Sequence, residues 1–205
     1  MRWFVFFAVV AALGTSAAFA RIDVPNLPTW TPTPESVRRV LNNRTVKAWQ
    51  MKNISQSDLN LKVVANIILR EEDGNPIWVM QSVGIQAIIW TKINAKTAAR
   101  SPLDVTVLNR DTLSWAKQMD FFYREKPWIF HAWSAVAENV DDAQPFQAKV
   151  IIPEGNDHSE YEYFFVIDAL QGDKLIRCTV DPDFNIVSVE DFPASEADAP
   201  ADETP

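Results

Sequence analysis

Residues 61–83 read LKVVANIILREEDGNPIWVMQSV, and they form the clearest hairpin pattern in the chain. The run 61–69 is rich in branched apolar residues, a composition typical of a strand. A turn follows at 71–76, where glycine and proline interrupt the apolar pattern. Residues 77–83 then return as a second apolar run. The segment therefore predicts two antiparallel strands that pair with each other.

Six more segments have the composition of strands. They are 85–93, 103–109, 146–152, 161–169, 174–181 and 185–190. The last four are separated by turns rich in Gly, Pro, Asn and Asp, so they predict a β meander in a strand-rich C-terminal half. Residues 45–51 are also compatible with a short strand. Residues 94–102 predict a polar connection.

A first helix is predicted over residues 34–43. Thr33 is a favourable N-cap residue, and Pro34 suits the first helical position because it needs no backbone donor there. A second helix is predicted over 112–125, where large apolar side chains recur at helical spacing. Residues 128–137 are compatible with either a strand or a helix, because apolar residues occupy most of their positions.

Together these segments predict an α+β domain in which one or two helices pack on antiparallel sheet. The domain is expected to span residues 34–192, and a boundary between two subdomains near 102–111 stays open. Residues 21–33 contain several prolines and predict an extended leader. Residues 193–205 contain no large apolar side chain, so they predict a disordered acidic tail.

The first 20 residues have the pattern of a cleavable signal peptide. Arg2 supplies a positive charge, residues 3–13 are an unbroken apolar run, and residues 18–20 are Ala-Phe-Ala. Cleavage is expected after Ala20, and the mature protein is expected to be periplasmic or secreted. An uncleaved membrane helix is the alternative, because a spanning helix needs about 20 apolar residues. After cleavage, no stable membrane insertion is expected.

Charge and cysteine content restrict the partners and the chemistry. The formal net charge of −8 at pH 7 disfavours binding to nucleic acid and to anionic lipid. Cys178 is the single cysteine, so the chain can form no internal disulfide. It lies in an alternating segment and is expected to be buried and inert. A reactive or intermolecular thiol is the alternative.

The C-terminal hairpin has a pattern of its own. Residues 161–190 contain an alternating strand, a turn at Gly172, a second strand that ends in Asp181, and an apolar return at 186–190. This stretch resembles the C-terminal hairpin of the PepSY family. The resemblance implies an exported, non-catalytic module of a kind thought to regulate proteases or bind peptides. Asn185 stands where that family usually has glycine, and no functional residue is carried over.

The sequence contains no convergent set of catalytic or metal-binding groups. Zinc needs three or four closely spaced ligands, and the mature chain has only His131 and His158. No serine has the glycine pattern of a nucleophile elbow. Asp181, Asp183 and Asn185 have the spacing of calcium-loop ligands, but the glycine and glutamate of such a loop are missing. This motif is also typical of a turn, so no cofactor or metal is expected.

Tryptophan is the strongest indication of function, because the chain holds eight. Such residues either fill the core or form an exposed surface for a protein, peptide or glycan. Trp30, on the proline-rich leader, is the first candidate for a contact residue. Trp128 and Trp133, which flank His131, are the next. We expect these four residues to include the partner-binding site.

These features favour a non-enzymatic protein- or peptide-binding module that assists assembly in the cell envelope. The alternative is a small carboxylate-dependent hydrolase acting on envelope glycan. Glu125 and Glu138 lie near aromatic residues in the sequence, where burial raises the pKa of a carboxyl group.

The export hypothesis predicts the first residue of the mature protein. Protein purified from the native envelope or medium should begin at Arg21, because small side chains at Ala18 and Ala20 fit the peptidase. N-terminal sequencing or intact mass measures this directly. An Ala18→Leu/Ala20→Leu variant should keep its leader. Native protein found in the cytosol with Met1 still attached would contradict the hypothesis.

Overall fold

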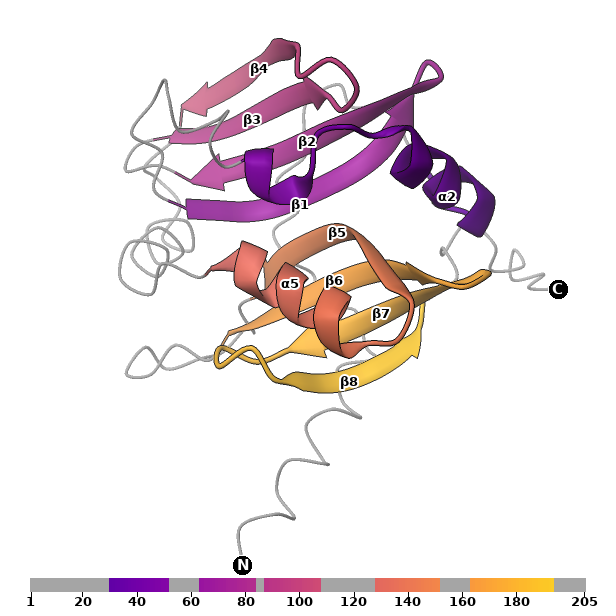
Figure 1. Cartoon of the computed structure of the whole chain (residues 1–205). Helices are drawn as coiled ribbons and strands as arrows, with labels where there is room; N and C mark the ends of the chain where they lie inside the picture. The colour runs from indigo at the N-terminus through magenta and orange to yellow at the C-terminus, as the bar shows by residue number, and fades with distance from the viewer. Residues whose placement is uncertain (1–29, 52–62, 84–86, 108–127, 152–162, 194–205) are drawn as a thin grey trace, which may run out of the picture.

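A computed structural model describes residues 30–51, 63–83, 87–107, 128–151 and 163–193 (Figure 1). The predicted signal peptide, most of the leader, the predicted helix 112–125 and nearly all of the tail lie outside the described residues. Within the described part of the chain, no helix is long and apolar enough to cross a membrane.

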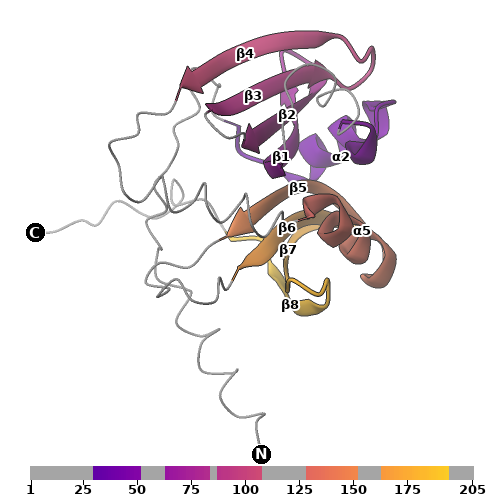
Figure 2. The ribbon, with the colours of Figure 1, turned by 90° about the vertical axis from the view of Figure 1, so that its left-hand side faces the viewer.

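The described residues form one antiparallel sheet with helices on one of its sides (Figures 1 and 2). The helices are α2 (Pro34–Asn43), α5 (Ile129–Asn139) and a single turn at 48–51. The strands are β1 (Val63–Glu72), β2 (Asn75–Val83), β3 (Ala87–Asn94), β4 (Arg100–Val107), β5 (Ala143–Ile151), β6 (Phe164–Gln171), β7 (Lys174–Val180) and β8 (Ile186–Asp191). The predicted α+β class is confirmed.

The strand order, β4-β3-β2-β1-β5-β6-β7-β8, divides the sheet into two similar halves. In each half a helix precedes a meander of four strands: α2 precedes β1–β4, and α5 precedes β5–β8. The halves meet where β1 pairs with β5 through Asn66–Lys149, Ile67–Ala148 and Ile68–Gln147. Figure 2 shows that both helices lie on the same side of the sheet. This repetition of architecture is not evident in the sequence.

The start of α2 is determined locally. Thr33 Oγ1 accepts a hydrogen bond from the backbone N–H of Ser36, and Ser36 Oγ accepts one from the N–H of Thr33. This reciprocal cap satisfies two donors that a helix start otherwise leaves unpaired. The buried residues Val37, Val40 and Leu41 then repeat at helical spacing and face the core.

The predicted β1–β2 hairpin is also confirmed. Its two-residue turn places Asp73 at φ 49° and Gly74 at φ 74°. Two consecutive residues with positive φ match the right-handed twist of the flanking strands, and Asp-Gly is a favoured pair for this turn.

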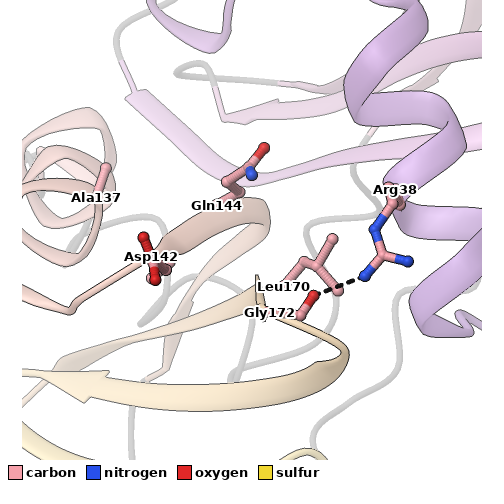
Figure 3. A pocket seen from close by; sticks show the side chains of 7 residues that line it. Arg38, Ala137, Asp142, Gln144, Leu170 and Gly172 are labelled. Carbon is pink, nitrogen blue, oxygen red and sulfur yellow. Dashed lines mark hydrogen bonds between the residues drawn. The ribbon is translucent and has the colours of Figure 1, made fainter.

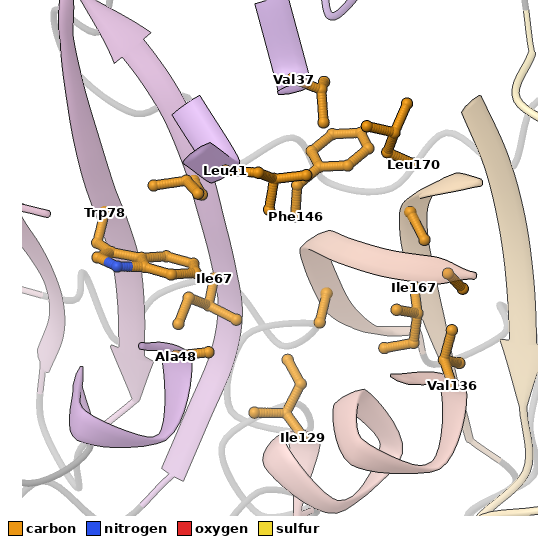
Figure 4. Close-up of a cluster of buried hydrophobic side chains, with 14 of the residues drawn as sticks. Val37, Leu41, Ala48, Ile67, Trp78, Ile129, Val136, Phe146, Ile167 and Leu170 are labelled. Carbon is orange, nitrogen blue, oxygen red and sulfur yellow. The ribbon is translucent and has the colours of Figure 1, made fainter. Parts of the chain in front are cut away.

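A shared apolar core joins the two halves (Figure 4). Trp78 of β2, Phe146 of β5 and Phe165 of β6 are completely buried. Trp78 Nε1 donates a hydrogen bond to the carbonyl of Val46 at 2.8 Å, so its polar group is satisfied inside the core. Trp133 of α5 packs against Trp78, with ring centroids 5.8 Å apart. The first half is therefore packed directly against the helix of the second.

Several predicted boundaries differ in the structure. Strands β1 and β2 extend into the turn predicted at 71–76 and leave only two residues between them. Residues 48–51 form a helical turn instead of the short strand expected at 45–51. The N–H groups of Thr45 and Val46 both donate to the carbonyl of Ala95. Two consecutive donors that share one acceptor do not follow the hydrogen-bond pattern of a β-strand. Strand β4 begins at Arg100, inside the predicted connection, because Arg100 already pairs with Ile93 of β3.

The open choice for residues 128–137 resolves as helix α5. Its buried side chains are Ile129, Ala132 and Val136, whose spacing of three and four residues places them on one helical face. Strand β5 then begins at Ala143, three residues before the predicted start at 146.

Trp78 should dominate the stability of this core. We expect Trp78→Ala to lower the free energy of unfolding by about 3–5 kcal/mol, because it leaves a large cavity. Trp78→Phe should lower the free energy of unfolding by less than Trp78→Ala does. Its main effect should be the loss of the hydrogen bond to the carbonyl of Val46. The matched control is Trp49→Ala, since Trp49 is 59% exposed and should change stability by less than about 0.5 kcal/mol. Equal losses for Trp78→Ala and Trp49→Ala in denaturant unfolding would contradict this arrangement of the core.

Candidate partner-binding surface

The start of α5 presents an exposed aromatic pair. Trp128 is the N-cap residue, and its carbonyl accepts a hydrogen bond from the N–H of His131 at 2.9 Å. This helical turn brings the two side chains together: their ring centroids are 5.2 Å apart and the planes differ by 26°. The Trp128 side chain is 51% exposed, which is unusual for so large an apolar group.

The pair is the outer end of an aromatic column that reaches the core. We define this column as Trp128, His131, Phe184 and Phe165. His131 meets Phe184 edge to face at 5.3 Å, and Phe184 stacks on Phe165 at 5.9 Å. Because Phe165 is completely buried, the exposed end of the column is supported by the hydrophobic core.

The third member of the column adopts an uncommon backbone conformation. Phe184 has φ 66°, a region that side chains other than Gly, Asn and Asp rarely enter, at a cost of about 1–2 kcal/mol. The surrounding turn holds it there. Asp181 Oδ1 accepts the N–H of Asn185 at 2.8 Å, and the Asp181 carbonyl accepts the N–H of Phe184 at 3.0 Å. The turn therefore fixes the ring beneath His131.

The hydrogen bonds between Asp181 and Asn185 are those of a turn, so this motif, whose spacing matches calcium-loop ligands, forms a turn here. The Asn185 side-chain amide donates to both carboxylate oxygens of Asp181. Within the described ranges, no group of three or more His, Cys, Asp or Glu residues is placed to hold a metal ion.

The structure separates the four residues singled out in the sequence. Trp128 and His131 lie together on the surface. Trp133 is only partly buried, but it faces the core, where it packs on Trp78. Trp30 lies edge to face on Phe146 at 6.1 Å, so this end of the leader docks on the domain itself.

Sequence reasoning missed Phe184 as a member of the surface. Its contact with His131 spans more than fifty residues, so periodicity could not reveal it. The available signal was an aromatic residue inside an Asp-Pro-Asp-x-Asn turn, where polar residues are usual.

A groove of about 540 Å³ lies between α2 and α5 (Figure 3). It is lined by Arg38, Ala137, Asp142, Ala143, Gln144, Leu170 and Gly172. Arg38 already donates to the carbonyl of Gly172 at 2.7 Å and to the carboxylate of Asp173 at 2.6 Å. Its charge is thus engaged in joining α2 to the β6–β7 turn, and the groove has no cluster of groups suited to catalysis.

The sheet face opposite the helices carries paired charges. Glu72 accepts hydrogen bonds from Arg70 and Lys92. Burial alone would raise the pKa of Glu72, but these two bonds outweigh burial and lower that pKa below its ordinary value. The carboxylate is therefore held ionised and serves to pair the two cations.

A second charge group involves the second half of the sheet. Asp168 is almost completely buried and accepts two hydrogen bonds from Arg177, at 2.7 and 3.1 Å. Burial lowers the pKa of the nearby Lys149; Arg177 lowers it further, whereas Asp168 opposes the shift. The Arg177 guanidinium also lies 5.1 Å from the centre of the Phe192 ring. Asp168 therefore pairs with Arg177, whereas the two cations, Arg177 and Lys149, repel each other.

The two glutamates named for the hydrolase alternative are not both described. Glu138 lies on the exposed side of α5, and Glu125 lies outside the described residues. Among the described acidic residues Asp168 is buried and Glu72 is partly buried, and both are bonded to cations.

Cys178 lies inside the core, with no exposed surface. Burial raises the pKa of its thiol to about 11, and the negative charge of Asp168 adds to the effect. The thiolate that would attack a disulfide or an electrophile is therefore scarce at neutral pH.

The comparisons with known proteins add no family assignment. No family model and no curated protein matches the chain. Among solved structures, a predicted lipoprotein from Clostridium difficile 630 aligns over 75% of this chain and 97% of its own length. The sequence identity is 13% and the TM-score is 0.47. A likeness at this level assigns no function.

Burial of Cys178 makes a direct prediction about thiol chemistry. The native protein should not react with Ellman's reagent at neutral or mildly alkaline pH, because the thiol is both inaccessible and protonated. The same protein in denaturant should release one equivalent per chain. Stoichiometric reaction of the folded protein, with its circular dichroism unchanged, would show that the thiol is accessible.

Proposed function

We propose that this protein is an exported, non-enzymatic module that binds a protein or peptide partner in the cell envelope. The exposed Trp128–His131 pair is its principal contact. The observation that carries this proposal is that a half-exposed tryptophan is held in one orientation by an aromatic column rooted in the core. The N-terminal signal pattern supports export.

The physical basis is the large apolar area that tryptophan offers at small entropic cost. Interface residues that contribute most to affinity are enriched in tryptophan, and they work best when they are rigid before binding. Trp128 is fixed at a helix start, stacked on His131, and supported by Phe184. Binding therefore removes little side-chain freedom from this surface.

The remaining chemistry of the described residues is consistent with binding. Glu72 and Asp168 are each paired with an arginine of the same chain, and the buried thiol is protonated. An acidic chain of net charge −8 favours partners with basic surfaces.

The proposal predicts that one side chain controls capture of the partner. Immobilised mature protein should enrich one or a few envelope proteins, identified by mass spectrometry. Trp128→Ala should then weaken binding of the purified partner by about 30-fold, equivalent to about 2 kcal/mol. Trp49→Ala is the matched control, because Trp49 is also exposed and lies outside the column.

Binding that is equally strong for Trp128→Ala, Trp49→Ala and the unchanged protein would exclude the aromatic pair as the contact. Enrichment of nothing above background would count against the binding function as a whole. Both variants should keep the unfolding midpoint of the unchanged protein, so that loss of binding is not confused with loss of the fold.

A further inference from the structure

We propose that the outer edge of β8 accepts an extended, basic segment of the partner as an additional strand. This inference rests on the proposed binding function and names the chemistry of the partner. Strand β8 is the last in the strand order and pairs with β7 on one side. Within the part of the chain that the structure describes, no strand occupies its other side. Its backbone groups there form a template for strand addition.

The two edges of the sheet differ in how they resist such pairing. The opposite edge strand, β4, contains Arg100 and Pro102, and both residue types obstruct strand addition. Strand β8 reads IVSVED and contains no proline, lysine or arginine. One bulge interrupts its pairing with β7 near Ile186, but Ser188–Asp191 pair regularly. Strand β8 does carry a bulge and two carboxylates, but it lacks proline and cationic side chains, so it is the less protected of the two edges against a basic strand.

Two exposed valines add apolar surface to this edge. Val187 is 45% exposed and Val189 is 48% exposed, and they are two of the four large apolar residues that are exposed in the described part of the chain. Val189 lies directly opposite the buried Cys178 and so lies on the helix-bearing side of the sheet. A β-branched apolar side chain on an added strand would cover these methyl groups.

Charge around β8 selects a basic partner. Residues 163–193 hold six acidic side chains and two basic ones. The two basic residues are already committed: Arg177 is bonded to Asp168, and Lys174 lies 3.7 Å from Asp191. Glu190 is exposed beside the free edge. Lysine or arginine on an added strand would therefore be attracted here.

The aromatic column connects this edge to Trp128. Phe184 precedes the first residue of β8 by two positions and contacts His131. A strand lying along β8 thus reaches the Trp128–His131 pair at one end. The expected partner segment alternates β-branched apolar residues with lysine or arginine, and carries a large apolar side chain beside Trp128.

Hydrogen exchange with short peptides tests the inference. The probe is a capped heptapeptide, Lys-Val-Lys-Val-Lys-Val-Lys, and the control peptide has glutamate in place of each lysine. The basic peptide should slow amide exchange in residues 186–191 at micromolar to millimolar concentration, and more strongly at low salt. The acidic peptide should not.

Variants of the two edges provide the matched comparison. Val187→Lys/Val189→Lys should weaken binding of the basic peptide by at least about tenfold, because it blocks the edge by charge and removes its apolar surface. Ser101→Lys/Thr97→Lys adds the same charge beside β4 and should leave binding unchanged. Glu190→Gln should weaken binding severalfold at low salt. All three variants should first be shown to unfold at the midpoint of the unchanged protein.

Absence of protection at 186–191 with the basic peptide at millimolar concentration would overturn the inference. Equal protection by the acidic peptide, or protection confined to β4, would do the same. The same variants distinguish failure of strand addition at β8 from failure of the proposed binding function. If the native partner is lost with Trp128→Ala but is bound normally by Val187→Lys/Val189→Lys, the binding function stands and strand addition at β8 is wrong.

Discussion

The fold depends on one short junction, the pairing of β1 with β5. It consists of the three residue pairs centred on Ile67 and Ala148, and it is the place where two four-stranded meanders become one sheet. So few ladder pairs contribute little by themselves, because each net hydrogen bond stabilises a protein by only about 1 kcal/mol. Side chains that cross the junction supply the rest. Trp78 packs on Trp133, and Trp30 packs on Phe146, so each half buries apolar surface that belongs to the other.

Whether the sequence could predict a feature depends on how far apart along the chain the interacting residues lie. The start of α2 and the β1–β2 turn were predictable, because their caps and positive-φ residues lie within a few positions of one another. The junction and the repeated architecture were not, because they join residues about eighty positions apart. Segment 128–137 stayed ambiguous because its apolar residues fit both periods. Packing against β5 and β6 selects the helix, since it buries one face of the segment and leaves His131 outside.

The candidate site also shows that contacts between residues close in sequence are predictable and that distant ones are not. Trp128 and His131 are three residues apart, so a helical start was enough to bring them together. Their support by Phe184 depends on a turn in the other part of the second half, and neither composition nor periodicity contains that contact. The sequence alone left the contact of Trp30 open. An aromatic residue on a proline-rich segment looks available in the sequence, but the nearest apolar surface is the protein's own Phe146.

The potentially reactive groups among the described residues are engaged in the fold. Glu72 and Asp168 are each bonded to arginine, and Cys178 is held protonated by burial. Reactive groups placed in this way contribute to stability and are withdrawn from solvent. Backbone strain is also present, at Phe184 among other residues, where an unfavourable φ is maintained by the Asp181 turn. Because that strain positions a ring under His131, it stabilises the geometry of an exposed aromatic pair, and a fixed apolar surface of this kind gains most when another chain covers it.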